Sequence, residues 1–186
     1  MFSLTLGQTK VYLTEQPLAF DGLLSAFPRY GAEAEQRFAS PRRRREWLSV
    51  RQLLHEVSGS GVSIVYDSSG RPQLKGSDLH ISIAHSDHYA AIALSSSPAG
   101  LDIEQAAGKA ERLKARFSTE EERRQLSPVE IWCAKEAVYK LFPHSAGLPL
   151  TAIRILSPER AVCQRLTAKL HFSRLESLHI CVAEET

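Results

Sequence analysis

Cysteine is scarce in this sequence, and its placement excludes two common uses of the residue. The chain has three cysteines, Cys133, Cys163 and Cys181, an odd number without CxxC or Cys/His spacing. A disulfide framework requires pairs, and a structural zinc site requires clustered thiolate and imidazole ligands. We therefore expect neither, and we expect a protein of the reducing cytoplasm.

The sequence also lacks the long apolar run that a membrane span requires. Nowhere do eighteen apolar residues follow one another, and the opening MFSLTLGQTKVYL has no basic region ahead of an apolar stretch. We expect no export signal and no membrane contact. The 186 residues, 43% hydrophobic and 24% charged, are typical of a globular protein with one full core or two small halves sharing an interface.

A large excess of charge of one sign is likewise missing. The net charge is only +2, so the chain as a whole is not built to neutralise a nucleic-acid backbone. A nucleic-acid-binding protein using the arginine run 42–45 remains an alternative, but it predicts a strongly basic domain with interleaved aromatics, and neither is present. An anionic partner must instead meet a local patch.

Helix signals are clear in the segments around residues 41–58 and 128–142. Ser40 is the expected N-cap of the first helix, with Pro41 at its first position and Gly59 after its end. One apolar stripe recurs at three- and four-residue steps and comprises Trp47, Val50, Leu54 and Val57. The pattern predicts a helix with one buried face, beside which Arg44 and Arg51 lie.

Two capping boxes are expected further along the chain. Ser118 pairs with Glu121 in the first, and Ser127 pairs with Glu130 in the second. The second opens a helix that we expect to stop at Pro143.

Strands are predicted on both sides of these helices. The expected strands cover residues 79–85, 89–94, 101–104, 150–156, 165–175 and 177–185, the last two as a hairpin, and a turn is expected in YDSSGRPQL at 66–74. Helices and antiparallel strands are thus interleaved twice, which indicates an α+β fold.

Two pairs of charged residues could carry chemistry. Asp102 and Glu104 are two apart in a predicted strand, so both carboxylates leave one face about 7 Å apart, and they could recruit a cation or lie harmlessly at an exposed strand end. Glu136 and Lys140 are one helical turn apart, a spacing also typical of a surface ion pair. Trp132 shares their face, which places Glu136 beside the apolar stripe, where a half-buried carboxylate needs a partner.

Taken in order, these segments resemble the 4′-phosphopantetheinyl transferase superfamily, in particular its monomeric, surfactin-synthetase-activating type. Two stretches resemble its signatures G-[IV]-D-[IV]-E and W-x-x-K-E-A-x-x-K, namely GLDIE at 100–104 and WCAKEAVYK at 132–140. Upstream, GRPQL resembles G-[KR]-P with Arg71 in the basic position, and ISIAHS resembles F-N-[IL]-S-H-S with His85 and Ser86 retained. Ser82 and Ala84 depart from that pattern, which leaves the hydrogen bonding of this strand open.

The resemblance implies a fold and an arrangement of domains. The fold would be two similar α+β halves, residues 1–96 and 97–186, related by a pseudo-two-fold axis with coenzyme A in the cleft between them. The short repeat of RFAS at 37–40 and RFST at 116–119 is consistent with such halves. A chain with both halves can form its cleft as a monomer.

The resemblance also implies a holo-[carrier protein] synthase. Such an enzyme transfers the 4′-phosphopantetheinyl group of coenzyme A to a serine of an apo acyl or peptidyl carrier protein and releases adenosine 3′,5′-bisphosphate. Mg²⁺, replaceable by Mn²⁺, would be held by Asp102, Glu104 and Glu136, with Glu136 and Lys140 as the catalytic residues. The implied coenzyme A contacts are Arg44, Arg51, Arg71, His85, Ser86 and Lys140.

Several points stay open at the level of sequence. Another Mg²⁺-dependent phosphoryl-group enzyme could use the same three carboxylates. The served carrier could belong to fatty-acid, polyketide or peptide synthesis. Four consecutive arginines point around the whole helix, so at most two of residues 42–45 share a target with Arg51.

Overall fold

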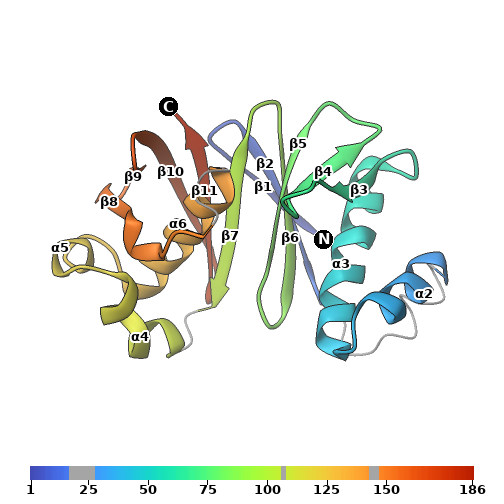
Figure 1. Ribbon diagram of the computed structural model, residues 1–186, viewed down its shortest axis with the longest axis horizontal. Helices are drawn as coiled ribbons and strands as arrows, with labels where there is room; N and C mark the ends of the chain where they lie inside the picture. Colours follow the sequence, from blue (N-terminus) through green and yellow to red (C-terminus); the bar gives the residue numbers. More distant parts are fainter. Residues whose placement is uncertain (17–27, 106–107, 143–146) are drawn as a thin grey trace.

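Two antiparallel sheets lie side by side and form the centre of the protein (Figure 1). The computed structural model describes residues 1–16, 28–105, 108–142 and 147–186. The first sheet has the order β1-β2-β6-β5, with bounds Phe2–Leu6, Thr9–Glu15, Tyr89–Ser95 and His80–His85. The second has the order β7-β11-β10-β9-β8, with bounds Ala99–Gln105, Leu178–Glu185, Leu166–Leu175, Arg160–Cys163 and Ile153–Ser157.

Each sheet has its own helices. Helices α2, Pro28–Arg37, and α3, Pro41–Ser58, lie beside the first sheet, together with the hairpin of β3, Ser63–Tyr66, and β4, Pro72–Lys75 (Figure 1). Helices α4, Lys109–Phe117, α5, Glu120–Arg123, and α6, Pro128–Leu141, lie beside the second. The expected α+β class is confirmed. Within the described residues, no helix is both long and apolar enough to cross a bilayer.

The two sheets follow a similar order of pairing. In the first, β2 precedes the helices and pairs with β6, which in turn pairs with β5. In the second, β7 precedes the helices and pairs with β11, which in turn pairs with β10. The chain crosses from one sheet to the other between Ser95 and Ala99.

The long helices begin where the sequence predicts. Helix α3 runs from Pro41 to Ser58, and its apolar stripe is buried or packed against buried residues. Helix α6 begins at Pro128 with the expected capping box of Ser127 and Glu130 and ends at Leu141. Pro143, expected to stop this helix, lies outside the described residues.

The first predicted capping box is wrong by one residue. The hydroxyl of Ser118 donates to the carbonyl oxygen of Lys114 at 2.7 Å, so Ser118 ends α4. Thr119 is the N-cap of α5 in its place, accepting from the backbone N–H of Glu122 at 3.2 Å, and Glu122 reciprocates at 2.9 Å. Ser118 and Thr119 could each serve as the N-cap of α5. Because the Ser118 hydroxyl is already bound to the end of α4, Thr119 caps α5.

The predicted strands are found, with one local difference. Residues 150–152 form a 3₁₀ turn instead of the start of a strand, and β8 begins at Ile153. The turn predicted in YDSSGRPQL is confirmed for its centre, residues 67–71, where Asp67 accepts from the backbone N–H groups of Ser69 and Arg71; Tyr66 and residues 72–74 belong to β3 and β4. Strands β1, β2, β3, β4 and β9 and helices α2 and α4 were not predicted.

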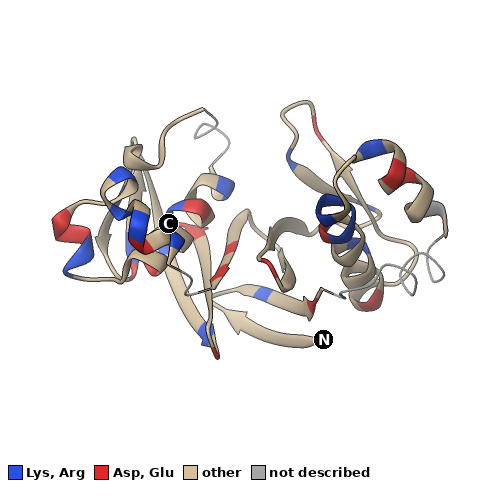
Figure 2. Ribbon diagram, turned by 90° about the horizontal axis from the view of Figure 1, so that it is seen from below, with Lys and Arg blue, Asp and Glu red and all other residues tan. Residues whose placement is uncertain are grey.

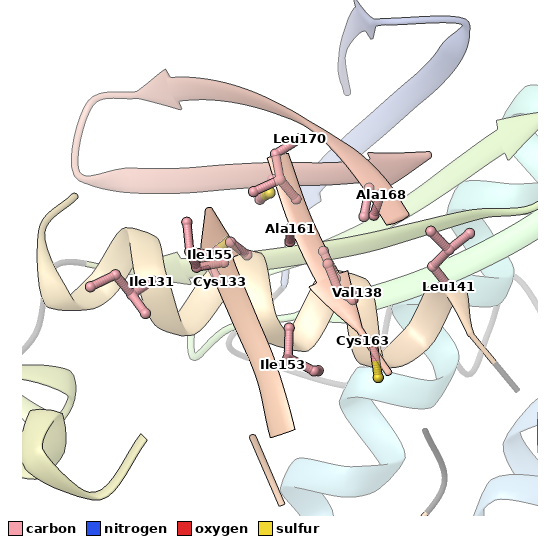
Figure 3. Packing of buried hydrophobic residues seen from close by; sticks show 14 of the residues in the cluster. Ile131, Cys133, Val138, Leu141, Ile153, Ile155, Ala161, Cys163, Ala168 and Leu170 are labelled. Atoms are coloured by element: carbon pink, nitrogen blue, oxygen red, sulfur yellow. The ribbon is translucent and has the colours of Figure 1, made fainter. Parts of the chain in front are cut away.

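Helix α6 is held by an apolar core on the inner face of the second sheet. Figure 3 shows Ile131, Cys133, Val138 and Leu141 of the helix among side chains of β8, β9 and β10. Ile131, Cys133 and Val138 have no exposed surface, and a fully buried aliphatic side chain contributes about 1.5–3 kcal/mol. This packing fixes which face of α6 is turned away from the core.

A second core joins the two sheets. Val11 and Leu13 of β2 belong to the same buried cluster as Leu101 and Ile103 of β7 and Ile180 of β11. Because these side chains come from both sheets, their shared burial holds the two sheets against each other.

Candidate active site

Strand β7 and helix α6 are in backbone contact at Gly100, the first residue of GLDIE. A Cβ atom on Gly100 would lie 1.9 Å from the carbonyl oxygen of Ala137 and 2.7 Å from the backbone nitrogen of Leu141. No side chain fits in that space, so glycine permits the close approach. The contact brings Asp102 up to the face of α6 that carries Glu136 and Lys140.

Asp102 and Lys140 form a buried ion pair at this junction. The Lys140 ammonium donates to Oδ1 of Asp102 at 2.7 Å and to the carbonyl oxygen of Leu101 at 2.9 Å. Asp102 is 6% exposed, and its Oδ2 is buried with no hydrogen-bond partner in the described part of the chain. Burial raises the pKa of Asp102 against the opposing effect of Lys140, while the Asp102 carboxylate raises the pKa of Lys140 in spite of burial.

Glu104 and Glu136 belong to the same electrostatic environment. Burial, followed by the charge of Asp102, raises the pKa of Glu104 to about 7, and a hydrogen bond from Trp132 opposes this. Burial and then Asp102 also raise the pKa of Glu136, which Lys140 opposes. The charge of Asp102 therefore makes ionisation of both glutamates harder, a situation in which a cation binds favourably.

The three carboxylates do not form a ready-made metal cluster. Across the described ranges, no three or more His, Cys, Asp and Glu side chains are grouped closely enough to hold a metal ion. The individual groups nevertheless fit a hard divalent cation, because all three supply carboxylate oxygens, two have a raised pKa beside Asp102, and Oδ2 of Asp102 is unpartnered.

Ser82 links the two sheets directly behind this site. Its hydroxyl, in β5, accepts a hydrogen bond from the backbone N–H of Leu101, in β7, at 2.9 Å, and Ser82 is 6% exposed. Leu101 thus binds Ser82 through its N–H and Lys140 through its carbonyl oxygen. Ser82, one of the two departures from the F-N-[IL]-S-H-S pattern, is therefore hydrogen-bonded across the two sheets.

A cleft of about 950 Å³ opens beside the Asp102–Lys140 pair. Its walls are the β3–β4 hairpin, strand β5 and the last turn of α6, and it is large enough for a cofactor-sized ligand. Arg71 and Lys140 both line it, and Nη2 of Arg71 donates to the carbonyl oxygen of Tyr139 at 3.4 Å. Two cations from different elements therefore face one cavity.

The other predicted coenzyme A residues lie outside the lining of this cleft. The Arg51 guanidinium is 3.2 Å from the ring centroid of Trp47, donates to the Trp47 carbonyl oxygen at 3.3 Å, and is 6% exposed. Arg44 donates to the carbonyl oxygen of Phe38 at 2.6 Å. Arg51 therefore braces helix α3 from within the protein, whereas the partly exposed Arg44 ties the start of α3 to Phe38.

His85 is the last residue of strand β5, near the Asp102–Lys140 pair, and Ser86 follows it. The charges of Lys140 and Asp102 both act on the pKa of His85, which burial lowers first of all. The Ser86 hydroxyl is buried without a hydrogen-bond partner in the described part of the chain, and its carbonyl oxygen accepts from Gln16 at 2.9 Å. Histidine is thus close to the charged pair, whereas the serine backbone is anchored to the first sheet.

Sequence reasoning missed a second buried ion pair, formed by Lys135 of α6 and Glu122 of α5. Lys135 is 1% exposed and lies 2.9 Å from Oε1 of Glu122, and it also donates to the carbonyl oxygen of Phe117 at 2.8 Å. Glu122 also accepts from the backbone N–H of Ile155 at 2.9 Å. This ion pair anchors α6, the helix that carries Glu136, to α5. The sequence feature that could have predicted the pair is a lysine on the apolar face of α6.

Comparison with known proteins bears on the same segment. No curated protein matches the chain. The model of the 4′-phosphopantetheinyl transferase superfamily matches residues 98–183, a segment that contains the Gly100 contact, the three carboxylates and Lys140. This match supports a phosphopantetheinyl transferase activity in general terms.

Proposed function

We propose that the protein transfers the 4′-phosphopantetheinyl group of coenzyme A to a serine of an apo acyl or peptidyl carrier protein and releases adenosine 3′,5′-bisphosphate. The observation that carries this proposal is the Asp102–Lys140 pair: Oδ2 of Asp102 has no hydrogen-bond partner among the described residues, and Lys140 lines a cleft that Arg71 also lines. The two cations could bind the anionic pyrophosphate, and the unpartnered carboxylate oxygen could bind a metal ion that accompanies it.

Asp102, Glu104 and Glu136 are the residues that would hold Mg²⁺, with Mn²⁺ as a possible substitute. When bound, the metal ion would neutralise charge on the pyrophosphate and act as a Lewis acid. The chain's own contribution is to bury Asp102 and to place two further carboxylates of raised pKa where the charge of Asp102 acts on them.

Glu136 is the proposed acceptor of the serine proton. Burial raises the pKa of Glu136 in the direction of neutral pH, and a general base is most effective when its pKa is near the working pH. The contact at Gly100 keeps the helix of Glu136 against β7. Lys140, one turn along α6, offers positive charge to the phosphates while bound to Asp102. Proton acceptance and charge compensation therefore come from one helix face.

The proposed coenzyme A site uses the cleft. Arg71 and Lys140 would contact phosphate groups directly, because both line the cavity. His85 and Ser86 would contribute at the end of β5. Arg44, which is bound to the carbonyl oxygen of Phe38 ahead of α3, and Arg51, which is stacked on Trp47 within α3, would act through the position of this helix.

We further propose that residues 1–96 and 97–186 are two similar halves related by a pseudo-two-fold axis. The parallel between β2-β6-β5 and β7-β11-β10 supports this, as does a Ser-Pro pair at the start of both α3 and α6. Both halves contribute to the cleft, so a monomer would suffice, and the protein would act in the cytoplasm as a monomeric enzyme of the surfactin-synthetase-activating type.

The test is transfer to a panel of apo carrier proteins followed by intact mass spectrometry. The carrier should gain one phosphopantetheine mass only when coenzyme A and Mg²⁺ are both present, and adenosine 3′,5′-bisphosphate should appear in equal amount. A carrier whose serine is replaced by alanine is the matched control. Transfer that continues unchanged in excess chelator contradicts the metal assignment, and bisphosphate release without carrier modification favours another phosphoryl-group enzyme.

A further inference from the structure

Helix α3 contains a buried acid that the proposed reaction does not use. Glu46 follows directly after four arginines, and Figure 2 shows the first turn of this helix as basic almost all the way around. Its side chain is nevertheless buried, at 5% exposure. A carboxylate removed from water is costly unless it is paired, so the partners of Glu46 indicate its role.

Glu46 connects helix α3 to the end of strand β5. Its Oε1 accepts from Nε of Arg42 at 2.8 Å, and its Oε2 lies 3.6 Å from Nε2 of His85, an ion-pair distance. Arg42 also pairs with Asp87, in the turn after β5, at 2.8 Å. Both partners of Glu46 are therefore tied to residues 85–87, and the acid occupies the centre of this network.

The charges around His85 show what Glu46 can do. Arg43 from α3 and Lys140 from α6 both disfavour a charged imidazole, as burial also does. Glu46 from α3 and Asp102 from β7 favour it, and Asp102 already binds Lys140 through one oxygen. Glu46 is therefore the carboxylate that offsets the two cations at His85.

We propose that Glu46 is a positioning residue that holds the imidazole of His85 at the end of β5 and favours its charged form. A charged imidazole beside Lys140 gives the proposed coenzyme A site an additional cation, and phosphate groups bind most strongly to charged donors. The inference rests on the proposed function for its purpose, but the pairing of Glu46 with His85 can be measured without coenzyme A.

The experiment compares Glu46→Gln with the parental protein by an NMR titration of the His85 ring. Glu46→Gln keeps the size of the side chain and removes its charge, so His85 should titrate at a lower pH in this variant. Glu56→Gln is the matched control, because Glu56 lies on the same helix, is exposed and accepts from Gln52. An unchanged His85 titration in Glu46→Gln overturns the proposal.

Coenzyme A binding by calorimetry supplies the second readout. Loss of a charged contact should weaken binding about tenfold at neutral pH. The difference should shrink as the pH is lowered, because acid restores the charged imidazole in the variant. A deficit of the same size at every pH indicates a structural role only and contradicts the proposal. If coenzyme A does not bind the parental protein, the proposed function fails while the titration result stands.

A second variant covers the case in which Glu46→Gln does not fold. Arg42→Gln removes the cation that binds the Glu46 carboxylate alongside His85. Since the Arg42 side chain is exposed, this substitution should be tolerated by the fold. With less competition for the Glu46 carboxylate, His85 should titrate at a higher pH than in the parental protein. A shift to lower pH, or none, counts against the proposed pairing.

Discussion

Lys140 binds one oxygen of Asp102 at 2.7 Å, and the other oxygen of this carboxylate is buried without a partner in the described part of the chain. The lysine comes from α6 and the aspartate from β7, two elements held in backbone contact at Gly100. Under the proposed function, Asp102 would hold a metal ion, whereas Glu136 would also accept the proton of the carrier serine.

The first prediction separates these two roles. Asp102→Asn keeps the size of the side chain and removes one negative charge, so its loss of transfer rate should diminish as Mg²⁺ or Mn²⁺ is raised. Glu136→Gln also removes the proposed base, which typically contributes about 10²- to 10⁴-fold in rate, so added metal should not restore it. The measurement is kcat against metal concentration, with circular dichroism as the fold control. Equal rescue of both variants contradicts the base assignment.

The second prediction concerns the pKa of Glu104, which burial raises from 4.5 to about 7. Since the folded protein favours the protonated acid, ionisation of Glu104 costs stability progressively as the pH rises from about 4.5 through 7. In chelator, Glu104→Gln should therefore be more stable than the parental protein at about pH 8, by about 1 kcal/mol after solvent screening, or 2–4 °C in Tm. The two proteins should converge near pH 4, and a pH-independent difference contradicts the argument.

The third prediction tests the backbone contact between β7 and α6. Gly100→Ala places a methyl group 1.9 Å from the Ala137 carbonyl oxygen, so helix α6 must shift. Overpacking of this kind costs about 1–3 kcal/mol, and the shift should also lower kcat by separating Lys140 from Asp102. Gly61→Ala is the control, because a Cβ there meets nothing within 4 Å. Denaturant unfolding and kcat measure both effects, and equal behaviour of the two variants excludes the contact.

The fourth prediction distinguishes two arginines that the sequence placed in one group. Arg71 lines the cleft, so Arg71→Ala should raise the KM for coenzyme A about tenfold with little change in Tm. Arg51 is stacked on Trp47 and buried, so Arg51→Ala should lower Tm through lost packing and a lost cation–π contact. KM and Tm measured for both variants decide the matter. A normal Tm together with a raised KM for Arg51→Ala would return this residue to the coenzyme A site.

Local signals allowed the elements around the site to be predicted. The Ser-Pro pairs mark the starts of α3 and α6, and alternating or continuous apolar residues mark β5, β6, β7, β10 and β11. The wrong prediction of the first capping box also has a local cause. Ser118 and Thr119 compete as caps, and the preceding helix uses the first of them.

The site was predictable as a set of residues but not as a geometry. The spacing of Asp102, Glu104, Glu136 and Lys140 along the chain indicates the family-type chemistry, yet it leaves open which of these side chains touch. The Lys140–Asp102 pair, and the absence of a ready-made metal cluster among the described residues, follow from how α6 packs on the second sheet. Packing depends on the whole core, which sequence periodicity does not describe.

The sequence by itself determined the fold class, the two long helices and the residues available for chemistry, because hydrophobic period and capping act over a few neighbouring residues. Only the tertiary structure decided that Arg51 is stacked on Trp47, that Ser82 joins the sheets through Leu101, and that Glu46 lies beside His85. The residues in the last two contacts come from segments far apart in the chain, and even Arg51 and Trp47, one turn apart, become a buried stack only when α3 packs. Contacts of this kind form when separate apolar faces are buried together, a property of the folded chain as a whole.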